Sequence, residues 1–568
     1  MTVTSLLPAS REDDFSLPSP PTDEEKYWYM GRQHRWLLAI QALALGLVVF
    51  SISRFALTKP ALWFFLGPAT LYTCTSIISL LSSGRKKRTS RIDHELRVLE
   101  YDPSQAPSVD VFLPSAGEPL EILDNTYRYV ADIDWYRDVR VIVHDDSARD
   151  EVRLLAESYG FDYLSRPNRG ELKKAGALKY MYERSTGDLI CIFDADFVPR
   201  FDYLHETVPY FDDPTVGIVQ TPQFFDTDKR MNWLQRCAGA TQELFYRFIQ
   251  PSRDRSKAAI CVGTCAIYRR SALEEAGGFA QIGHSEDVHT GVKLMKAGYH
   301  LRYVPILVSK GLCPDSLLGF LNQQYRWCTG SMSLLADKSF HKNPIFSVRQ
   351  RLCFWSGFMY YISTAVNIFV APLPGLIMLF FFPQHIFPKN TVWLLGAIAL
   401  WYFVLPTMMK SNWRLDVLRV QQLYSFAHAV AIVHILTGRT KEWVATGAAN
   451  TKKTPLALTI SRVMRITVFI TQALVWTAIT RATLGYGIQH TWAMLCFALV
   501  SAYLQIPMLF MRAKPKEKKA AASSTGSGRG RRRTARPSEG YQAPRRVANA
   551  RVAGIAAQLG TDPALARP

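Results

Sequence analysis

Long uncharged runs on both sides of a charged middle region constrain this chain more than any other feature. Trp36–Ser53 carries no charge over 18 residues, and Ala61–Gly84 carries none over 24. Both runs reach the length that a helix needs to cross a bilayer. The basic run Arg85–Arg91 follows at once, and basic residues collect on the cytoplasmic side of membranes. The sequence therefore predicts a transmembrane hairpin over residues 35–84, with the N-terminus and the following region in the cytosol.

The second half of the chain returns to apolar runs. Residues 85–345 are charged and mixed, so we expect a cytosolic domain there. Residues 346–511 are again apolar and predict a membrane domain of about four helices plus an interfacial helix at 423–438. Six spans in all would keep both termini in the cytosol and leave outside loops poor in Lys and Arg. A full span at 423–438 would instead give seven or eight. The four expected helices are at 359–382, 391–409, 466–480 and 482–511.

Both ends of the chain are expected to be disordered. Residues 1–34 begin with a lead rich in Pro, Ser and acidic residues, which lacks the pattern of a signal peptide. Residues 512–568 are of low complexity and hold 14 Lys and Arg against 3 Asp and Glu. This tail accounts for much of the net charge of +20, and contact with anionic lipid headgroups explains it as well as RNA would. We therefore expect a lipid bilayer as partner and no nucleic acid.

Three apolar strands in the middle region end in polar or acidic residues. Val109–Pro114 leads into Ser115–Pro119, Val139–Asp146 ends in two acids, and Leu189–Phe193 ends in Asp194-Ala195-Asp196. Strands that alternate with helices form a mostly parallel sheet, and ligands bind at the carboxyl ends of its strands. Residues i and i+2 share a face, so Asp194 and Asp196 offer hard oxygen ligands for Mg²⁺ or Mn²⁺. An isolated pair of this kind is more often a solvated turn.

Four further stretches carry candidate chemistry. Lys174-Ala-Gly176 suits a diphosphate because glycine admits close backbone approach, and Cys261–Tyr268 is rich in small residues for the same purpose. Ser285-Glu286-Asp287 opens a helical pattern, where capping of the helix and a general base are both good explanations of the acids. Gln323–Trp327 offers an arginine for a diphosphate and an indole for a sugar face, or else a pair at the membrane interface.

Taken in order, these motifs resemble the processive family 2 glycosyltransferases of the cellulose synthase type. That family has the pattern D, DxD, [T/S]ED and QxxRW with membrane helices on both sides. The resemblance covers roughly residues 30–510 and implies a multi-pass α-helical membrane protein with a cytosolic α/β domain of the GT-A fold. The matching residues are Asp145-Asp146, Asp194-Ala195-Asp196, Ser285-Glu286-Asp287 and Gln323-Gln324-Tyr325-Arg326-Trp327.

The resemblance also implies roles for these residues. Asp287 would be the catalytic base that deprotonates the acceptor hydroxyl, and Asp194 and Asp196 would hold Mg²⁺ or Mn²⁺. A UDP-sugar donor would contact Asp145 or Asp146 at the uracil, Asp194 at the ribose, and Lys174 and Arg326 at the diphosphate. The growing polysaccharide chain would contact Gln323, Trp327, Cys261, Gly263 and Thr264.

The activity that the resemblance implies is inverting, processive polymerisation of a β-1,4-glucan from UDP-glucose, with translocation across the plasma membrane and possible accessory export subunits. Two stretches depart from the family. The gating-type loop at 439–453 keeps Trp443-Val444 but lacks the full FxVTxK motif, and the tail lacks the second motif of a cyclic-di-GMP module, so we expect no such module in this chain.

Three alternatives remain open at this stage. The first is a related synthase that makes a mixed-linkage or β-1,3-glucan, a hyaluronan-like polymer or a glucomannan. The second is a non-processive transferase with a lipid-linked acceptor, which would have less use for the Gln323–Trp327 motif. The third is a transporter or scaffold with an inactive transferase domain, which four intact motifs disfavour.

Overall fold

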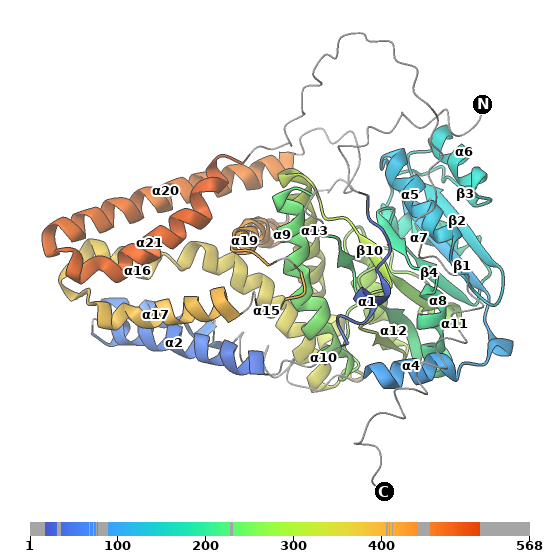
Figure 1. The fold of residues 1–568 in the computed structure, drawn as a ribbon, viewed down its shortest axis with the longest axis horizontal. Helices are drawn as coiled ribbons and strands as arrows, with labels where there is room; N and C mark the ends of the chain where they lie inside the picture. Colours follow the sequence, from blue (N-terminus) through green and yellow to red (C-terminus); the bar gives the residue numbers. More distant parts are fainter. Residues whose placement is uncertain are drawn as a thin grey trace, which may run out of the picture. The chain divides into compact units, whose positions relative to one another are not determined.

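A seven-stranded sheet forms the core of the middle region in a computed structural model of the chain (Figure 1). The strand β8 runs antiparallel to its neighbours β4 and β6, and all other neighbouring strands are parallel. The expected α/β domain with a mostly parallel sheet is therefore confirmed. In spatial order the strands are β3 (Asp162–Leu164), β2 (Val139–Asp145), β1 (Val109–Ser115), β4 (Leu189–Ile192), β8 (Ala266–Arg269), β6 (Val216–Gln220) and β9 (His300–Tyr303). The structure describes residues 17–30, 36–58, 60–67, 69–71, 73, 74, 77, 89–227, 231–404, 407, 409–411, 413–439 and 455–511.

Both faces of this sheet are buried, because its strands are apolar along most of their length. On β1, Val109, Val111 and Leu113 join one apolar cluster, and Phe112 between them joins another. A strand produces this alternation because successive side chains point to opposite faces. Helices that contact its strands include α6 (Asp150–Ser158), α7 (Lys174–Tyr182), α10 (Gln250–Asp254), α11 (Arg270–Ala276) and α12 (Glu286–Lys296), whereas α5 (Leu120–Ala131) contacts Phe197–Pro199, a strand of a second sheet.

A smaller sheet extends the acidic strand end. Its strands, in the order β5 (Phe197–Pro199), β10 (Ser309–Gly311) and β7 (Phe224–Phe225), pair antiparallel and then parallel. Because β5 begins directly after Asp196, this sheet fixes the chain on the far side of the acidic turn.

The N-terminal segment 17–30 lies against the α/β domain, although we expected the lead to be disordered. Helix α1 (Asp23–Lys26) ends in a lysine whose side chain is 1% exposed. The Nζ atom of Lys26 lies 2.7 Å from a carboxylate oxygen of Asp202 and 2.5 Å from one of Glu206. The expectation was wrong here because composition does not reveal ion-pair partners that lie 176 residues further along the chain.

Three helices among the described residues are long and apolar enough to cross a membrane, namely Val348–Phe381, Pro455–Tyr486 and Ile488–Leu509. Two shorter apolar helices, Leu43–Arg54 and Thr391–Val404, fall where we expected the first and fourth spans. These three helices support a multi-pass arrangement. Outside the described residues lie 78–84 of the second expected span, 440–453 of the gating-type loop, and the tail 512–568.

The break between the last two spans lies at Gly487. Helix α20 (Pro455–Tyr486) continues through Arg481, so the expected span 466–480 is part of a longer helix. Gly487 has a φ of 81°, and helix α21 (Ile488–Leu509) begins directly after it. A single arginine does not interrupt a helix, whereas a residue with positive φ does, and glycine adopts such a φ without strain.

Helix α19 (Asp416–Leu436) contains the segment that we expected to lie on the membrane surface. It packs against α13 (Leu317–Ala336) and α15 (Val348–Val370), and half of its residues are buried. Its Arg419 donates from Nη2 to the carbonyl oxygen of Tyr503 at 2.7 Å. Pro507 in α21 has no N–H, so this carbonyl lacks its helical partner, and Arg419 supplies the missing donor.

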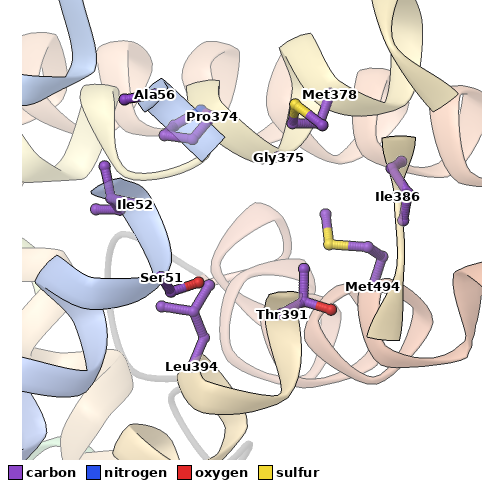
Figure 2. A pocket seen from close by; sticks show the side chains of 10 residues that line it. All are labelled: Ser51, Ile52, Ala56, Pro374, Gly375, Met378, Ile386, Thr391, Leu394 and Met494. Atoms are coloured by element: carbon purple, nitrogen blue, oxygen red, sulfur yellow. The ribbon is translucent and has the colours of Figure 1, made fainter. Parts of the chain in front are cut away.

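A cavity of about 60 Å³ lies among the apolar helices (Figure 2). Helix α2 (Trp36–Thr58), α16 (Leu373–Phe381), α17 (Pro388–Ala399) and α21 contribute most of its lining. The lining is almost wholly apolar and contains no charged side chain, so this cavity is not a candidate for the chemistry that the sequence motifs predict.

Replacing Lys26 by Met tests the N-terminal contact. The variant leaves the carboxylates of Asp202 and Glu206 without their buried cation, and breaking a buried pair costs about 3–5 kcal/mol. We expect a loss of that size in the free energy of unfolding of the purified protein. As a control, Arg153→Met removes an exposed ion pair with Glu157 and should cost less than about 1 kcal/mol. Equal losses in the two variants would contradict the burial of Lys26.

Candidate functional site

The acidic turn after β4 is held by backbone contacts on both sides. The N–H of Asp194 donates to Oγ1 of Thr264 at 2.8 Å, and the carbonyl of Ala195 accepts from Oγ1 of Thr126 at 2.8 Å. Burial, followed by the charges of Asp194 and Glu118, raises the pKa of Asp196 to about 7. The carboxylates of Asp194 and Glu118 therefore lie close enough to Asp196 to disfavour its ionisation.

A divalent cation fits this donor set. Mg²⁺ is usually held by one or two carboxylates together with substrate phosphates and water, so Asp194 and Asp196 suffice. The charge of the cation would also relieve the repulsion that raises the pKa of Asp196. Within the described ranges no group of three or more His, Cys, Asp or Glu side chains could hold a metal ion.

Lys174 joins the acidic turn to a second loop. It is the first residue of α7, and its Nζ donates to Oδ1 of Asp194 and, at 2.8 Å, to the carbonyl of Gly263. Burial alone would lower the pKa of Lys174, but the charges of Asp194, Glu286 and Asp287 together raise it above its usual value. The ammonium group therefore stays charged among these carboxylates.

Asp287 lies in the first turn of α12 and is poised to exchange a proton near neutral pH. Its Oδ1 accepts from the N–H of Val288 at 2.8 Å. Burial and then the neighbouring charge of Glu286 raise the pKa of Asp287 to about 7, against the opposing effects of Lys174 and Arg326. A carboxylate with such a pKa is suited to act as a general base.

Gly263 makes room for this carboxylate. A Cβ atom at this position would lie 2.9 Å from Cβ and 3.0 Å from Oδ2 of Asp287. Gly263 also has a φ of 78°, which other residues rarely adopt. The small residues around Cys261, Gly263 and Thr264 thus bring backbone directly against the side chain of Asp287.

Helix α13 carries the Gln323–Trp327 motif. Gln323 is buried, whereas Arg326 and Trp327 are partly exposed. Arg326 is close enough to lower the pKa of Asp287 by its charge. One turn further along α13, a Cβ atom on Gly330 would lie 1.8 Å from Oγ of Ser285, the residue that precedes α12. The helix with Arg326 and the helix with Asp287 are therefore in direct contact.

The two acids at the end of β2 have different partners. Asp145 is fully buried and accepts from the backbone N–H groups of Ser147 at 3.1 Å and Arg149 at 2.9 Å, which folds the turn into α6. Asp146 forms a bidentate pair with Arg166, with N–O distances of 2.6 and 2.8 Å. Their proposed contact with a uracil stays a prediction.

Sequence reasoning missed several residues that hold the site. Glu118 had no role of its own within the strand end Ser115–Pro119, and Arg166 had no role at all. Three buried glutamines that bind the loop around Gly263 received no role at all. Their signal in the sequence is faint, since a lone glutamine has no characteristic spacing. These glutamines are Gln220, Gln223 and Gln250.

Comparison with known proteins finds a protein family that matches part of this chain. Residues 189–410 match the model of the family described as "Glycosyl transferase family group 2". The chain is 33% identical over 328 residues to "Cellulose synthase 1" of Komagataeibacter xylinus, a match covering 56% of this chain and 21% of that protein. It is 32% identical over 326 residues to the "Cellulose synthase catalytic subunit [UDP-forming]" of Pseudomonas fluorescens (strain SBW25), covering 55% and 42%. In both cases the match spans less than half of the relative's length.

Among solved structures, the mannosyltransferase PcManGT from Pyrobaculum calidifontis, in complex with GDP-Man and Mn²⁺, is 20% identical to this chain. The match covers 66% of this chain and 99% of the mannosyltransferase, with a TM-score of 0.43. At that score the similarity carries no argument about the site.

Gly263→Ala tests the contact with Asp287. The added methyl must displace the carboxylate, and a misplacement near 1 Å costs about 100-fold in rate. We expect a loss of that order in the rate of sugar transfer by membrane vesicles. Gly160→Ala is the matched control, because Gly160 has a φ of 72° but nothing lies within 4 Å of its added Cβ. If both variants keep the wild-type rate, Gly263 does not position Asp287.

Proposed function

We propose that this chain, which carries a family 2 glycosyltransferase domain similar to that of cellulose synthases, polymerises a β-1,4-glucan from UDP-glucose and passes it across the plasma membrane. One observation carries the proposal: Arg326 and Lys174, which also binds Asp194, lie within electrostatic reach of a half-buried carboxylate, Asp287, whose pKa is raised to about 7. Cations for a leaving diphosphate and a base for an attacking hydroxyl are what transfer from a UDP-sugar requires.

The reaction would proceed as an in-line displacement. Asp287 takes the proton of the acceptor hydroxyl, the oxygen attacks the anomeric carbon, and the bond from that carbon to UDP breaks. Attack from the face opposite the leaving group converts an α-linked donor into a β-linked product. A general base of this kind contributes about 10²–10⁴-fold to the rate.

The leaving diphosphate would meet positive charge on two sides. Lys174 and Arg326 would approach its oxygens, and an arginine can bind two of them at once. Mg²⁺ or Mn²⁺ on Asp194 and Asp196 would supply Lewis-acid charge to the same group when bound. The bidentate pair of Asp146 and Arg166 would stabilise the loop that leads to Lys174.

Helix α13 would bind the end of the growing polymer through Gln323 and Trp327. The hydroxyl of Tyr325 on this helix lies 3.0 Å from Nδ1 of His434 on α19, and α13 also packs against α15 and α20. The helix expected to hold the polymer thus contacts both the base helix and the apolar helices. This arrangement supports a coupling of synthesis to translocation.

Incorporation of labelled sugar into polymer tests the function. Membrane vesicles with the full chain are supplied with UDP-glucose, UDP-N-acetylglucosamine or GDP-mannose, and the product is digested with linkage-specific enzymes. We expect polymer from UDP-glucose alone, degraded by a β-1,4-glucanase. Polymer from another donor or with another linkage would replace the proposed product by a related one. No polymer from any donor would overturn the processive function.

Asp287→Asn separates the base from donor binding. The amide keeps the shape of the side chain but cannot accept the proton, so elongation should fall at least 100-fold. The affinity for UDP with Mg²⁺, measured by calorimetry, should change less than about 3-fold. The control is Asp150→Asn, a matched substitution in the first turn of α6 with an 88% exposed side chain. A large loss of UDP affinity in Asp287→Asn would show that the base is misassigned.

A further inference from the structure

One short loop, Ile260–Cys265, contacts three charged groups of the site; we refer to it as the 260–265 loop. The carbonyl of Gly263 accepts from Lys174, and Oγ1 of Thr264 accepts from the N–H of Asp194. The Cα atom of Gly263 lies against Asp287. The position of this loop therefore sets the spacing between the donor side of the site and the base.

The 260–265 loop does not owe its shape to regular structure. It precedes β8, and both Gly263, at 78°, and Cys265, at 53°, have a positive φ. A non-glycine residue in this conformation is strained and persists only when the surrounding structure holds it there. The contacts that hold the loop are thus part of the construction of the site.

A single side chain, Gln220, binds this loop at three points. Its Nε2 donates to the carbonyls of Thr264 at 2.8 Å and Cys265 at 3.1 Å. Its Oε1 accepts from the N–H of Val262 at 3.0 Å. Gln220 is the last residue of β6 and is fully buried, so its amide is fixed in place by the central sheet.

Two more glutamines bind the outer part of the same loop. Nε2 of Gln223 donates to the carbonyl of Val262 at 3.0 Å, and its Oε1 accepts from the hydroxyl of Tyr246 at 2.7 Å. Gln250 binds the backbone of Ile260 in both directions, at 2.6 and 2.9 Å. The loop is therefore bound along its length, but only Gln220 reaches the residues on both sides of Gly263.

We infer that Gln220 is a positioning residue for the transfer reaction, acting through the 260–265 loop on Lys174, Asp194 and Asp287 without touching substrate. The inference rests on the proposed function. The amide of Gln220 offers a donor and an acceptor on one planar group, and this loop uses both. A glutamate would turn a charged oxygen toward two carbonyls. A leucine would remove the partner of the N–H of Val262 and of the carbonyl of Thr264, whereas the carbonyl of Cys265 would keep its bonds from Thr221.

The kinetic test uses the full chain in membrane vesicles, with Gln220→Leu and the isosteric Gln220→Glu. We expect the turnover rate to fall about 10- to 100-fold in both, since small displacements of catalytic groups cost this much. The affinity for UDP with Mg²⁺ should stay within about 3-fold of wild type, because binding tolerates small shifts of Lys174 and Asp194 that the alignment of donor and base does not. Asn125→Leu, which removes a buried amide bound to the carbonyl of Pro18, is the control and should keep the wild-type turnover rate.

Hydrogen exchange at single amides tests the contact independently of activity. In Gln220→Leu, the exchange rate of the Val262 amide should rise at least 10-fold. In Gln220→Glu it should rise less, because the glutamate keeps an acceptor for this amide. The amide of Ile260 should keep its protection in both variants. In Gln250→Leu, the amide of Ile260 should lose its protection and that of Val262 should keep it. If Gln220→Leu does not fold, the glutamate variant carries both tests.

The outcomes distinguish this inference from the proposed function. Unchanged protection of Val262 in Gln220→Leu would overturn the contact, whether or not the protein makes polymer. Lost protection with an unchanged turnover rate would overturn the positioning role. If wild-type vesicles make no polymer from any donor, the proposed function fails and the positioning role falls with it, while the exchange data still decide whether Gln220 holds the loop.

Discussion

The site depends on one ammonium group, that of Lys174, held between the carboxylate of Asp194 and the carbonyl of Gly263. Without it, the carboxylates at the strand end and at the start of α12 would repel one another more strongly. Burial, and then the charge of neighbouring carboxylates, raises the pKa values of Asp196 and Asp287 to about 7 even with the lysine present. In the proposed function, a divalent cation held by Asp194 and Asp196 would offset this negative charge, and Lys174 and Arg326 would face the diphosphate.

Close backbone contacts transmit this arrangement to the rest of the domain. Gly263 lies against Asp287 with no space for a side chain, and Gly330 on α13 lies against Ser285 in the same way. The start of α12 is therefore held from two sides by glycines, one on the 260–265 loop and one on α13. Because neither contact leaves free space, a shift of α13 would displace Ser285 and Asp287. This is a property of packing and not of any particular charge.

Sequence reasoning found the features that are encoded locally. The strands β1, β2 and β4 are apolar runs covered on both faces, and such runs are visible without a structure. It failed where the partners are distant in the chain: the buried Lys26 with Asp202, and Gln220 with the 260–265 loop. The placement of 423–438 on the membrane surface stays a prediction, because a short apolar run with two histidines looks the same whether a helix is packed inside a bundle or lies on a membrane. We grouped the motifs into one site because of their order in the chain. The polar contacts that hold each motif in place have no recognisable pattern in the sequence.

Buried polar contacts recur where the apolar helices meet the α/β domain. The carboxylate of Glu243 on α9 (Trp233–Leu244) accepts from the backbone N–H groups of Lys410 and Ser411, which precede α19. Nη2 of Arg253 donates to Oγ of Ser356 on α15 at 2.8 Å.

Buried ionic and polar groups add little net stability compared with apolar packing, but they are directional and penalise every other arrangement. A surface of leucines would bind the helices as tightly while allowing them to slide. For a reaction in which the base lies on one helix and the polymer end on the next, we infer that fixed geometry is worth more than extra stability at these contacts. The same reasoning explains why the loop beside Asp287 is held by three amides and not by a hydrophobic contact.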